Sequence, residues 1–600
     1  LVQIAIGTGL LGYLAFALGL VGWLRPGVLS VVLAGGLVSA ALVLARSSGP
    51  HVGSGLERRW FLARGLPRWS AVAGLFAVLL ALLGALLPEI EYDALWYHLT
   101  FPARYLRSGW LLDLPSEHMS PVPQHVELLY TYGLMFGDAR GAKLIHFGFG
   151  LLAALWTGLL AARYVGRRWA LPAAALFVTA PTVTWEMTTA YNELPLTFLA
   201  IGATTLLLRW RERGDRQLLV IAALLLGLGL AGKHLAYFFL VPLAAVVLLA
   251  PMATGERGAA RRFGDAALFC TIAVAVALPW YVRAWYYTGN PLFPMFYDVL
   301  TSAGLEIRRW DAQAQRGWGA AMDRYGHGRA PLDLLLLPWR MTWDGVRYAG
   351  SLGPAWLFFL PLLPLAWKRI ALPLRLLAFI AGAYFLLWVT PYSSFQVRYL
   401  VPLVPLLSIL VVAVIRELQV LLRHAGSRTL QGLPAGLMIV VLFLNLPVFL
   451  PLADARVGWI PNTIHSIKPS AWATAVGLYD ADRYTAARVR PYSAVQFMNA
   501  ELAPDARVVT FSEASHFYTR AEMLHDYSRS VAAGTWGARR PGSEDEAYRS
   551  LRAAGVTHIL WDKVRQDIDD DDFAVRSPAF RERYTRRVYE DALVELDELL

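Results

Sequence analysis

Long apolar runs separated by short polar loops dominate the first three quarters of the chain. Each run has about 17–22 residues, the length an α-helix needs to cross the hydrocarbon core of a bilayer. The first run, residues 1–24, exceeds the roughly 7–15 apolar residues of a secretory signal peptide, so we interpret it as a retained span. The pattern predicts about thirteen membrane spans, near residues 2–24, 27–45, 69–88, 144–162, 169–185, 190–208, 217–232, 235–251, 265–282, 353–367, 371–390, 397–415 and 432–452.

Basic residues recur in every second short loop. They are Arg46, Arg58, Arg59, Arg64, Arg68, Arg163, Arg167, Arg168, Arg209, Arg211, Arg213, Arg216, Arg257, Arg261, Arg262, Lys368, Arg369, Arg416, Arg423 and Arg428. Loops with an excess of Lys and Arg stay on the cytoplasmic side. The alternate loops are then outside, at residues 89–143, 185–193, 232–234, 283–353 and 391–398, and so is the tail from residue 451.

The tail differs from the rest because charged and apolar residues mix in it. Residues 506–511 (ARVVTF) and 556–561 (VTHILW) have the apolar, β-branched character of strands, with helical patterns between them. The acidic run 569–572 lacks the Gly and the terminal Glu of a calcium-binding EF-hand loop, so we predict a solvated turn there.

The predicted fold class is therefore an α-helical polytopic membrane protein with a small C-terminal α/β domain. Residues 1–68 carry two N-terminal spans and a basic cytoplasmic loop. Residues 69–452 form the main transmembrane module, with outside loops 89–143 and 283–352, and residues 453–600 form the α/β domain.

Composition agrees with this interpretation. Hydrophobic residues make up 56% of the chain, mean hydropathy is +0.44, and only 16% of residues are charged, against about 25% in soluble proteins. The net charge of +11 comes from the basic loops, so it indicates membrane topology rather than nucleic-acid binding. Cys270 is the one cysteine and lies in an apolar run, which excludes a disulfide framework.

Candidate chemistry begins at residues 87–98 (LPEIEYDALWYH), where Glu89, Glu91 and Asp93 follow directly on an apolar run. A carboxylate costs roughly 2.5–3.5 kcal/mol at the bilayer centre, so these acids are expected at one membrane face. Aromatic residues alternate with them, as is typical of the interface where a lipid-linked substrate would present its headgroup.

The rest of this loop, about fifty residues long, has its own signals. Residues 98–112 have the spacing of a helix lying in the interface, and prolines then break the chain around Glu117, His118 and His125. With Asp93, these side chains could form an acid/base or metal-binding cluster. The alternative is that each is an interfacial polar residue.

Further charged residues lie on the same predicted face. Glu193 begins a span, where a helix N-terminus favours an anion, although a simple helix cap would look the same. Lys233 and His234 interrupt an apolar stretch, and Arg283 and Arg398 lie at span ends. Three cations beside two acids suit a substrate that carries a phosphate. A lysine that extends to the interface is the alternative for Lys233.

The order of these motifs resembles the type C glycosyltransferase (GT-C) superfamily. It consists of the acid-rich span end, the long first loop, YNELP at 191–195, the GK break at 232–233, the aromatic stretch 278–297 and RYLVPLVP at 398–405. More narrowly, residues 69–415 resemble bacterial phospholipid-carrier-dependent glycosyltransferases akin to protein O-mannosyltransferases and aminoarabinose transferases. The strand-like GVTHILW of the tail is similar to theirs as well.

The resemblance implies roles for individual residues. Asp93 matches the catalytic base, Glu117 the second acid of the first loop, and Glu193 an acid usually written Asp. Lys233 and Arg398 match cations that hold the lipid phosphate. This chain departs from the pattern in two ways, because its catalytic loop follows the third span rather than the first, and because Glu replaces Asp at 193.

Further assignments complete the predicted site. Arg283 and His234 are expected beside the donor phosphate, and Glu91, Tyr97 and His98 beside the acceptor or the sugar. The cofactor prediction is a divalent metal (Mg, Mn or Zn) or none, with Glu117 and His118 as its ligands and Glu193 as a further candidate.

The functional hypothesis is transfer of a sugar from a polyprenyl-phosphate-linked donor to a glycan, lipid or protein acceptor, by an inverting single displacement. The expected location is the bacterial inner membrane, with the active site and the tail on the periplasmic side, in contact with membrane lipids and not with nucleic acid. A transporter or flippase of lipid-linked sugars and a noncatalytic envelope-assembly protein are the alternatives. The sequence does not identify the sugar or the oligomeric state.

Overall fold

A computed structural model describes residues 1–46, 65–115, 117–391, 393–426, 430–446, 469–503, 505–510, 516–525, 543–563, 575 and 577–600. Most of the basic loop between the second and third runs, the residues just after the last run and the acidic run 569–572 lie outside the described residues.

The transmembrane module is helical. Its elements are α1 (Val2–Leu20), α2 (Pro26–Arg46), α4 (Leu66–Ala85), η1 (Ala94–His98), α5 (Thr100–Ser108), α6 (His125–Leu134), α7 (Arg140–Tyr164), η2 (Arg167–Trp169), α8 (Ala170–Thr179), α9 (Pro181–Glu186), α10 (Glu193–Arg213), α11 (Arg216–Gly232), η3 (His234–Ala236), α12 (Tyr237–Leu249), α13 (Ala259–Thr288), α14 (Tyr297–Ser302), α15 (Ala312–Asp323), α16 (Pro331–Trp343), α17 (Ala355–Phe359), η4 (Leu360–Leu362), α18 (Leu363–Ala366), α19 (Leu372–Trp388), η5 (Val397–Leu403), α20 (Val404–His424), η6 (Leu430–Gly432) and α21 (Leu433–Leu444).

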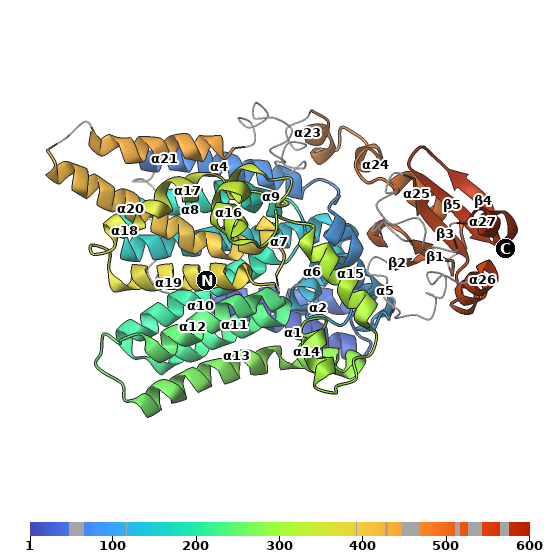
Figure 1. Ribbon diagram of the computed structural model, residues 1–600, viewed down its shortest axis with the longest axis horizontal. Helices are drawn as coiled ribbons and strands as arrows, with labels where there is room; N and C mark the ends of the chain where they lie inside the picture. The colour runs from blue at the N-terminus through green and yellow to red at the C-terminus, as the bar shows by residue number, and fades with distance from the viewer. Residues whose placement is uncertain are drawn as a thin grey trace.

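The C-terminal domain mixes short helices with a sheet. Its elements are α23 (Pro469–Ala475), α24 (Ala481–Ala486), α25 (Tyr492–Glu501), β1 (Arg507–Thr510), η8 (His516–Tyr518), β2 (Glu522–His525), α26 (Glu544–Ala553), β3 (His558–Asp562), α27 (Pro578–Tyr584), β4 (Thr585–Glu590) and β5 (Val594–Leu599). Figure 1 shows this domain at one end of the bundle, next to α5 and α15.

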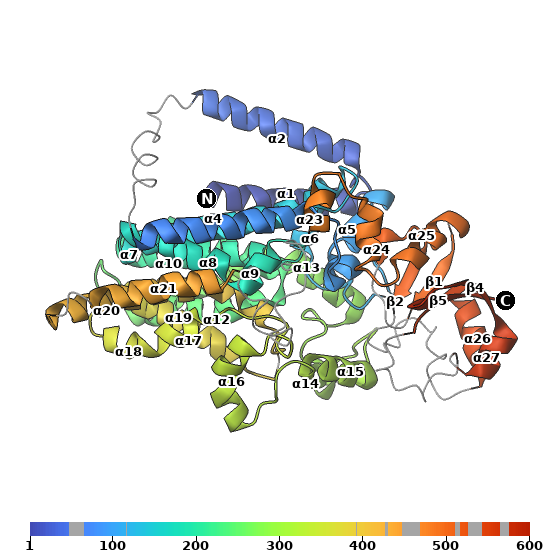
Figure 2. The same cartoon turned by 90° about the horizontal axis from the view of Figure 1, so that it is seen from above.

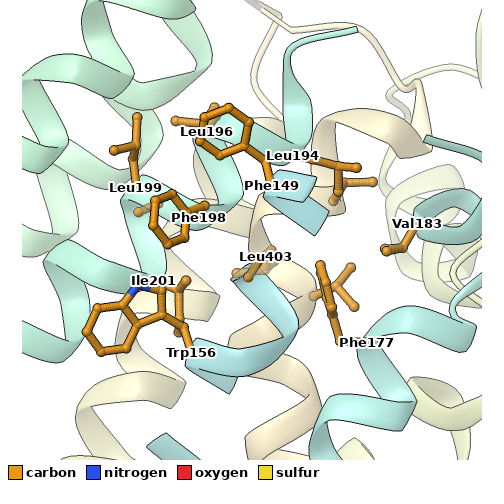
Figure 3. Packing of buried hydrophobic residues seen from close by; sticks show 14 of the residues in the cluster. Phe149, Trp156, Phe177, Val183, Leu194, Leu196, Phe198, Leu199, Ile201 and Leu403 are labelled. Carbon is orange, nitrogen blue, oxygen red and sulfur yellow. The ribbon is translucent and has the colours of Figure 1, made fainter. Parts of the chain in front are cut away.

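Helix α10 occupies the centre of the bundle, where it packs against α7 and α11. Nearly all of its side chains are buried. In Figure 3, Phe149 and Trp156 of α7 lie among Phe198, Leu199 and Ile201 of α10, and the Phe149 and Phe198 rings are 5.7 Å apart. This close packing fixes the position of α10 in the bundle, and Glu193 is the first residue of this helix.

Helix α2 has the opposite character. Figure 2 shows it standing apart from the other helices, alongside α1. Its apolar side chains face outward, with Val31 72%, Leu37 71% and Val38 59% exposed. Such a surface is stable only in contact with an apolar surrounding such as lipid. Together with the long apolar helices of the bundle, it identifies a multi-pass membrane protein.

Five described helices are long and apolar enough to cross a membrane. They are Val2–Leu20, Leu66–Ala85, Arg140–Tyr164, Ala259–Thr288 and Val397–His424, and six further apolar helices are shorter. The predicted count of about thirteen spans is not confirmed. The predicted run 169–185, for example, breaks at Ala180, whose ψ of 122° leaves the helical region because Pro181 follows it.

The two ends of the bundle carry different charges. Helix α10 has 21 residues from Glu193 to Arg213, which at 1.5 Å per residue is about 30 Å, the thickness of the hydrocarbon core. At the arginine end, Arg163 of α7 forms an ion pair with Glu212. The acids of residues 89–93 lie toward the opposite end, beside the C-terminal domain.

The C-terminal sheet has the strand order β2-β1-β3-β5-β4. Strands β2, β1 and β3 are parallel, whereas β5 is antiparallel to both β3 and β4. Alternate residues face opposite sides, since Val508 and Leu560 pack with α25 while Val509 and Ile559 pack with α26. The predicted α/β domain and both of its predicted strands are confirmed, although Phe511 lies outside the described residues.

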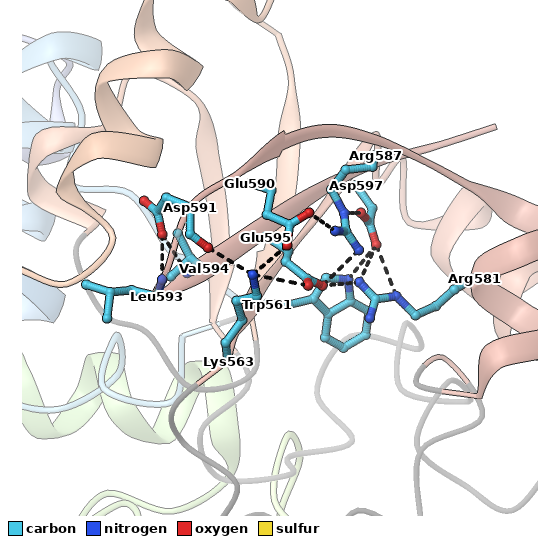
Figure 4. A network of polar contacts seen from close by, with 10 residues as sticks. All are labelled: Trp561, Lys563, Arg581, Arg587, Glu590, Asp591, Leu593, Val594, Glu595 and Asp597. Carbon is cyan, nitrogen blue, oxygen red and sulfur yellow. Dashed lines mark hydrogen bonds and ion pairs between the residues drawn. The ribbon is translucent and has the colours of Figure 1, made fainter.

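Charged side chains join β3, β4 and β5 on one side of the sheet (Figure 4). Asp597 is buried and accepts hydrogen bonds from Trp561 Nε1 at 3.0 Å and from Arg587 Nε at 2.5 Å. Lys563 Nζ donates to Glu590 at 2.6 Å and lies 3.6 Å from Glu595. Because each buried charge has a partner, this network stabilises the pairing of the last three strands.

Substituting Gly141 by Ala should destabilise the fold. A Cβ there would collide with the backbone carbonyl of Gly133 where α6 and α7 meet, and such overpacking costs typically about 1–3 kcal/mol. Gly148, in the same helix, has nothing within 4 Å of an added Cβ. We expect a lower thermal midpoint in detergent for Gly141→Ala and no loss for Gly148→Ala. Equal midpoints for the two variants would contradict the close approach of α6 and α7 at Gly133 and Gly141.

Candidate active site

The segment that carries Asp93 is tied down by its own acids. Glu89 Oε1 accepts hydrogen bonds from the backbone N–H groups of Ile90 and Glu91 at 2.8 and 3.0 Å. Its Oε2 accepts the Thr189 hydroxyl at 2.9 Å and the Ala190 N–H at 3.1 Å. One buried carboxylate therefore joins the loop that begins at residue 89 to the loop 185–193.

Lys143 of α7 fixes the end of the preceding span. Its Nζ is buried and donates to the carbonyls of Gly84, Leu87 and Pro88 at 3.0, 2.8 and 3.3 Å. A helix leaves its last four carbonyls without intrahelical partners, and a lysine satisfies them well. The chain therefore leaves α4 in a defined direction toward Asp93, which immediately precedes the single π-helical turn η1.

Four predicted site residues form one ion cluster. Arg398 Nη2 lies 2.6 Å from Asp93 Oδ2, and Arg398 Nε lies 3.8 Å from Glu193 Oε1. Lys233 Nζ donates to the same Glu193 oxygen at 2.5 Å. The Glu193 side chain is 0% exposed, whereas those of Arg398, Asp93 and Lys233 are 11%, 16% and 18% exposed. Asp93 and both cations are therefore partly exposed, whereas Glu193 is not.

Helix ends bring these charges together. Glu193 is in the first turn of α10, where the helix dipole favours an anion. Lys233 directly follows α11 in an extended conformation, and Arg398 lies in η5 at the start of the last long span. The cluster is also lined by aromatic rings, since the Arg398 guanidinium lies 5.0 Å from the Tyr191 ring and 5.2 Å from the Tyr399 ring.

Further buried polar residues hold Lys233, and two of them, Asn192 and Glu127, are not among the predicted site residues. Asn192 Oδ1 accepts from Lys233 at 2.8 Å, while its Nδ2 donates to Glu127 Oε1 at 3.1 Å. Nδ1 of His98 lies 2.7 Å from the same Glu127 oxygen. Asn192 adjoins the Glu193 identified in the sequence, but nothing local indicates that Glu127, 65 residues earlier in the chain, is its partner.

Glu117 and His118 lie in another environment. Glu117 Oε2 accepts a hydrogen bond from Trp96 Nε1 at 3.0 Å, and its Oε1 lies 3.3 Å from Nδ1 of His516 in the C-terminal domain. The His118 ring packs 5.0 Å from the Trp96 ring. Asp93 and Glu193 are thus brought together, whereas Glu117 contacts a different set of residues.

The residues predicted as ligands of a divalent metal do not gather into a ligand set in the described part of the chain. The Glu193 carboxylate faces two cations, and Glu117 is engaged by Trp96 and His516. Within the described part of the chain, no three His, Cys, Asp or Glu side chains gather as ligands. We therefore derive no step through a metal.

The other predicted donor-site residues are engaged elsewhere. Arg283 donates to the backbone carbonyls of Ser120 and Leu112, so it fixes the loop 89–143 against α13. The His234 ring lies parallel to the Tyr281 ring at 6.2 Å.

The residues expected beside the acceptor or the sugar flank Asp93. Glu91 accepts a hydrogen bond from Trp185 Nε1 at 2.7 Å. Tyr97 is buried, with its ring 4.1 Å from that of His98 and 5.3 Å from that of Trp96. His125, from the same loop, instead packs its ring 4.6 Å from that of Tyr13 in α1, so it does not join the cluster.

Solved structures share this fold. The structure is similar to ArnT from Cupriavidus metallidurans bound to undecaprenyl phosphate (16% identity, TM-score 0.51) and to the same protein in the apo state (15% identity, TM-score 0.55). Each likeness covers 88% of this chain and 98% of that one. The Archaeoglobus fulgidus oligosaccharyltransferase in the apo form aligns with 82% of this chain and 69% of its own at 15% identity and a TM-score of 0.47. No protein-family model and no curated protein sequence matches the chain. The predicted resemblance is confirmed at the level of the fold, which the chain shares with the two ArnT structures.

Replacing Glu91 should change how stability depends on pH. Burial, and after it the nearby Glu89 carboxylate, raises the pKa of Glu91 from an ordinary 4.5 to about 8. A raised pKa in the folded state gives stability that is complete below pH 4.5 and is lost as the pH rises through about 8. Glu91→Gln cannot titrate but keeps an acceptor for Trp185, so the wild type should lose thermal stability relative to this variant between pH 5 and 9.

The matched control is Glu256→Gln, an exposed acid in the loop before α13. Its thermal midpoint should follow that of the wild type across the same pH range. A constant difference between the wild type and Glu91→Gln at all pH values would show that Glu91 does not carry this titration.

Proposed function

We propose that this chain is a membrane glycosyltransferase that moves a sugar from a polyprenyl-phosphate-linked donor to an acceptor hydroxyl. The observation that carries the proposal is the accessible cluster in which Asp93, Arg398, Glu193 and Lys233 alternate in charge. It offers an acid for the acceptor proton and cations for a lipid phosphate. The fold shared with ArnT, which was crystallised with undecaprenyl phosphate, supports the choice of donor.

In this mechanism Asp93 is the general base. It accepts the proton of the acceptor hydroxyl as the acceptor oxygen bonds to the anomeric carbon, while the bond from that carbon to the phosphate oxygen breaks. The polyprenyl phosphate leaves with the bonding electrons, and Lys233 and Arg398 stabilise the charge that develops on it. Because the acceptor attacks opposite the leaving group, the anomeric configuration inverts.

Charge accounting supports the same assignment. During transfer Asp93 loses one negative charge by taking a proton, and the departing phosphate gains one. Arg398 lies 2.6 Å from Asp93, so a phosphate bound at the guanidinium would develop its charge next to the point where the carboxylate charge disappears. The net charge near Arg398 then stays constant, which limits the cost of reaction in a partly buried site.

The proposed location is the bacterial inner membrane with the cluster facing the periplasm. Arginine-rich loops at the opposite end of α10 support this orientation by the positive-inside rule. The cluster lies at helix ends, whereas transporters usually bind their coupling ions near the midplane on broken helices. This placement favours transfer over transport. A glycan, a lipid or a protein could supply the acceptor hydroxyl.

Asp93→Asn should abolish most of the transfer activity. The amide still accepts a hydrogen bond from Arg398 but cannot take a proton, and loss of a general base typically costs about 10²–10⁴-fold in rate. The measurement is transfer of labelled sugar from a synthetic polyprenyl-phosphate sugar to a membrane extract by the purified protein in nanodiscs.

Asp138→Asn is the matched control, because Asp138 is an exposed acid of the same loop, with a side chain 58% exposed. It should keep wild-type activity. If Asp93→Asn were as active as Asp138→Asn, Asp93 would not be the base.

Lys233→Gln should weaken use of the donor. Gln can still bond to Glu193 and Asn192, but it removes a cation from the proposed phosphate site. Hydrogen bonds to charged groups contribute about 1.5–3 kcal/mol, so KM for the donor should rise roughly 10–100-fold. Inhibition by free polyprenyl phosphate should weaken in parallel.

The control is Lys368→Gln, because Lys368 is an exposed lysine at the arginine end. This variant should leave KM and the inhibition constant unchanged. Equal constants for the two variants would exclude Lys233 from phosphate binding.

A further inference from the structure

The C-terminal domain is docked directly on the segment that carries Asp93. Its turn η8 packs against η1. Leu95 of η1 is buried with Val489 and Tyr492 of the domain, and Phe517 and Tyr518 of η8 pack against the same cluster. More than four hundred residues of sequence separate these two turns, so the contact belongs to the tertiary fold.

His516 places a polar side chain inside this interface. Its side chain is 0% exposed, and its Nδ1 lies 3.3 Å from Glu117 Oε1. Glu117 is itself buried, with 1% of its side chain exposed. A buried carboxylate is costly without polar partners. Trp96 donates a hydrogen bond to one Glu117 oxygen, and a protonated His516 forms an ion pair with the other at 3.3 Å.

Glu117 connects His516 to the turn η1. Trp96 Nε1 donates to Glu117 Oε2 at 3.0 Å, and Trp96 is three residues after Asp93. The Trp96 ring also packs between those of Tyr92 and Tyr97, at 5.9 and 5.3 Å. A π-helical turn is an uncommon conformation that persists only where its surroundings support it. Glu117 supplies part of that support.

A second contact from η8 acts on the other side of Asp93. The Tyr518 hydroxyl donates to the backbone carbonyl of Glu89 at 2.7 Å. Glu89 in turn bonds to the second outside loop at Thr189 and Ala190. The turn η8 therefore contacts the Asp93 segment both before and after Asp93, which restricts its position at two points.

We infer that His516 is a positioning residue for the proposed base. Through Glu117 and Trp96, it holds η1 so that Asp93 stays beside Arg398. The C-terminal domain is then a structural part of the active site, not an independent tail. This inference rests on the proposed function for its kinetic consequence, while the docking itself can be tested without any activity.

The test compares two replacements of His516 in the full-length protein. Asn places an amide close to the position of Nδ1 and retains a polar partner for Glu117, whereas Phe keeps a ring but has none. Since small displacements of a reacting group can cost about 10²-fold, His516→Phe should lower kcat roughly 10–100-fold. KM for the donor should stay unchanged, because Lys233 and Arg398 are untouched, and His516→Asn should restore most of the rate.

His558→Phe is the matched control, since His558 lies in β3 and its Nδ1 contacts Thr557 instead of the transmembrane module. It should keep wild-type kcat.

Glu117→Gln separates positioning from chemistry. Its amide can still accept from Trp96 and donate to His516, so activity within a few-fold of wild type supports positioning, and a loss as large as that of Asp93→Asn would contradict it.

Hydrogen–deuterium exchange gives a readout independent of transfer. His516→Phe should speed exchange of the amides of residues 92–99, and His558→Phe should leave them as in the wild type. Unchanged exchange together with unchanged kcat in His516→Phe would overturn the inference. If the wild type transfers no sugar, the proposed function fails, and the exchange result still decides whether His516 orders this segment.

Discussion

The pairing of a fully buried carboxylate with two cations at the ends of separate helices is the constraint on which the site depends. Glu193 cannot remain ionised at the start of α10 unless Lys233 and Arg398 approach it. The three residues come from the beginning of α10, the end of α11 and the turn before α20. The ion pairs of Glu193 bring the end of α11 and the turn before α20 next to the start of α10. The close packing of α10 is consistent with this arrangement.

The acids of residues 89–93 show how similar side chains take different roles. Glu89 is satisfied by backbone N–H groups and a hydroxyl, and Glu91 by Trp185, so both hold loops together. Asp93 faces a guanidinium instead. Because Asp93 follows both anchors and directly precedes η1, its position is set by neighbours on both sides while its own carboxylate stays partly exposed.

Local patterns in the sequence account for most of the fold. Apolar length predicts the long helices, apolar and β-branched residues predict β1 and β3, and the span ends predict that Asp93, Glu193, Lys233 and Arg398 share one face. Helix breaks inside apolar runs, such as the one at Ala180, mean that hydropathy alone does not fix the number of spans. Partners far apart in sequence were not predictable either, since nothing near Glu127 indicates Asn192 and nothing near Glu117 indicates His516.

The contact between Asp93 and Arg398 also has a consequence for the order of events. The Arg398 guanidinium lies 2.6 Å from the Asp93 carboxylate. On the proposed mechanism, a donor phosphate that binds Arg398 competes with Asp93 for the same N–H groups and so frees the carboxylate to meet the acceptor hydroxyl. An acceptor that arrives first would meet a carboxylate still held by Arg398. This coupling follows from one guanidinium serving two anions, and it gives a physical reason for placing the base and the phosphate site within one ion cluster.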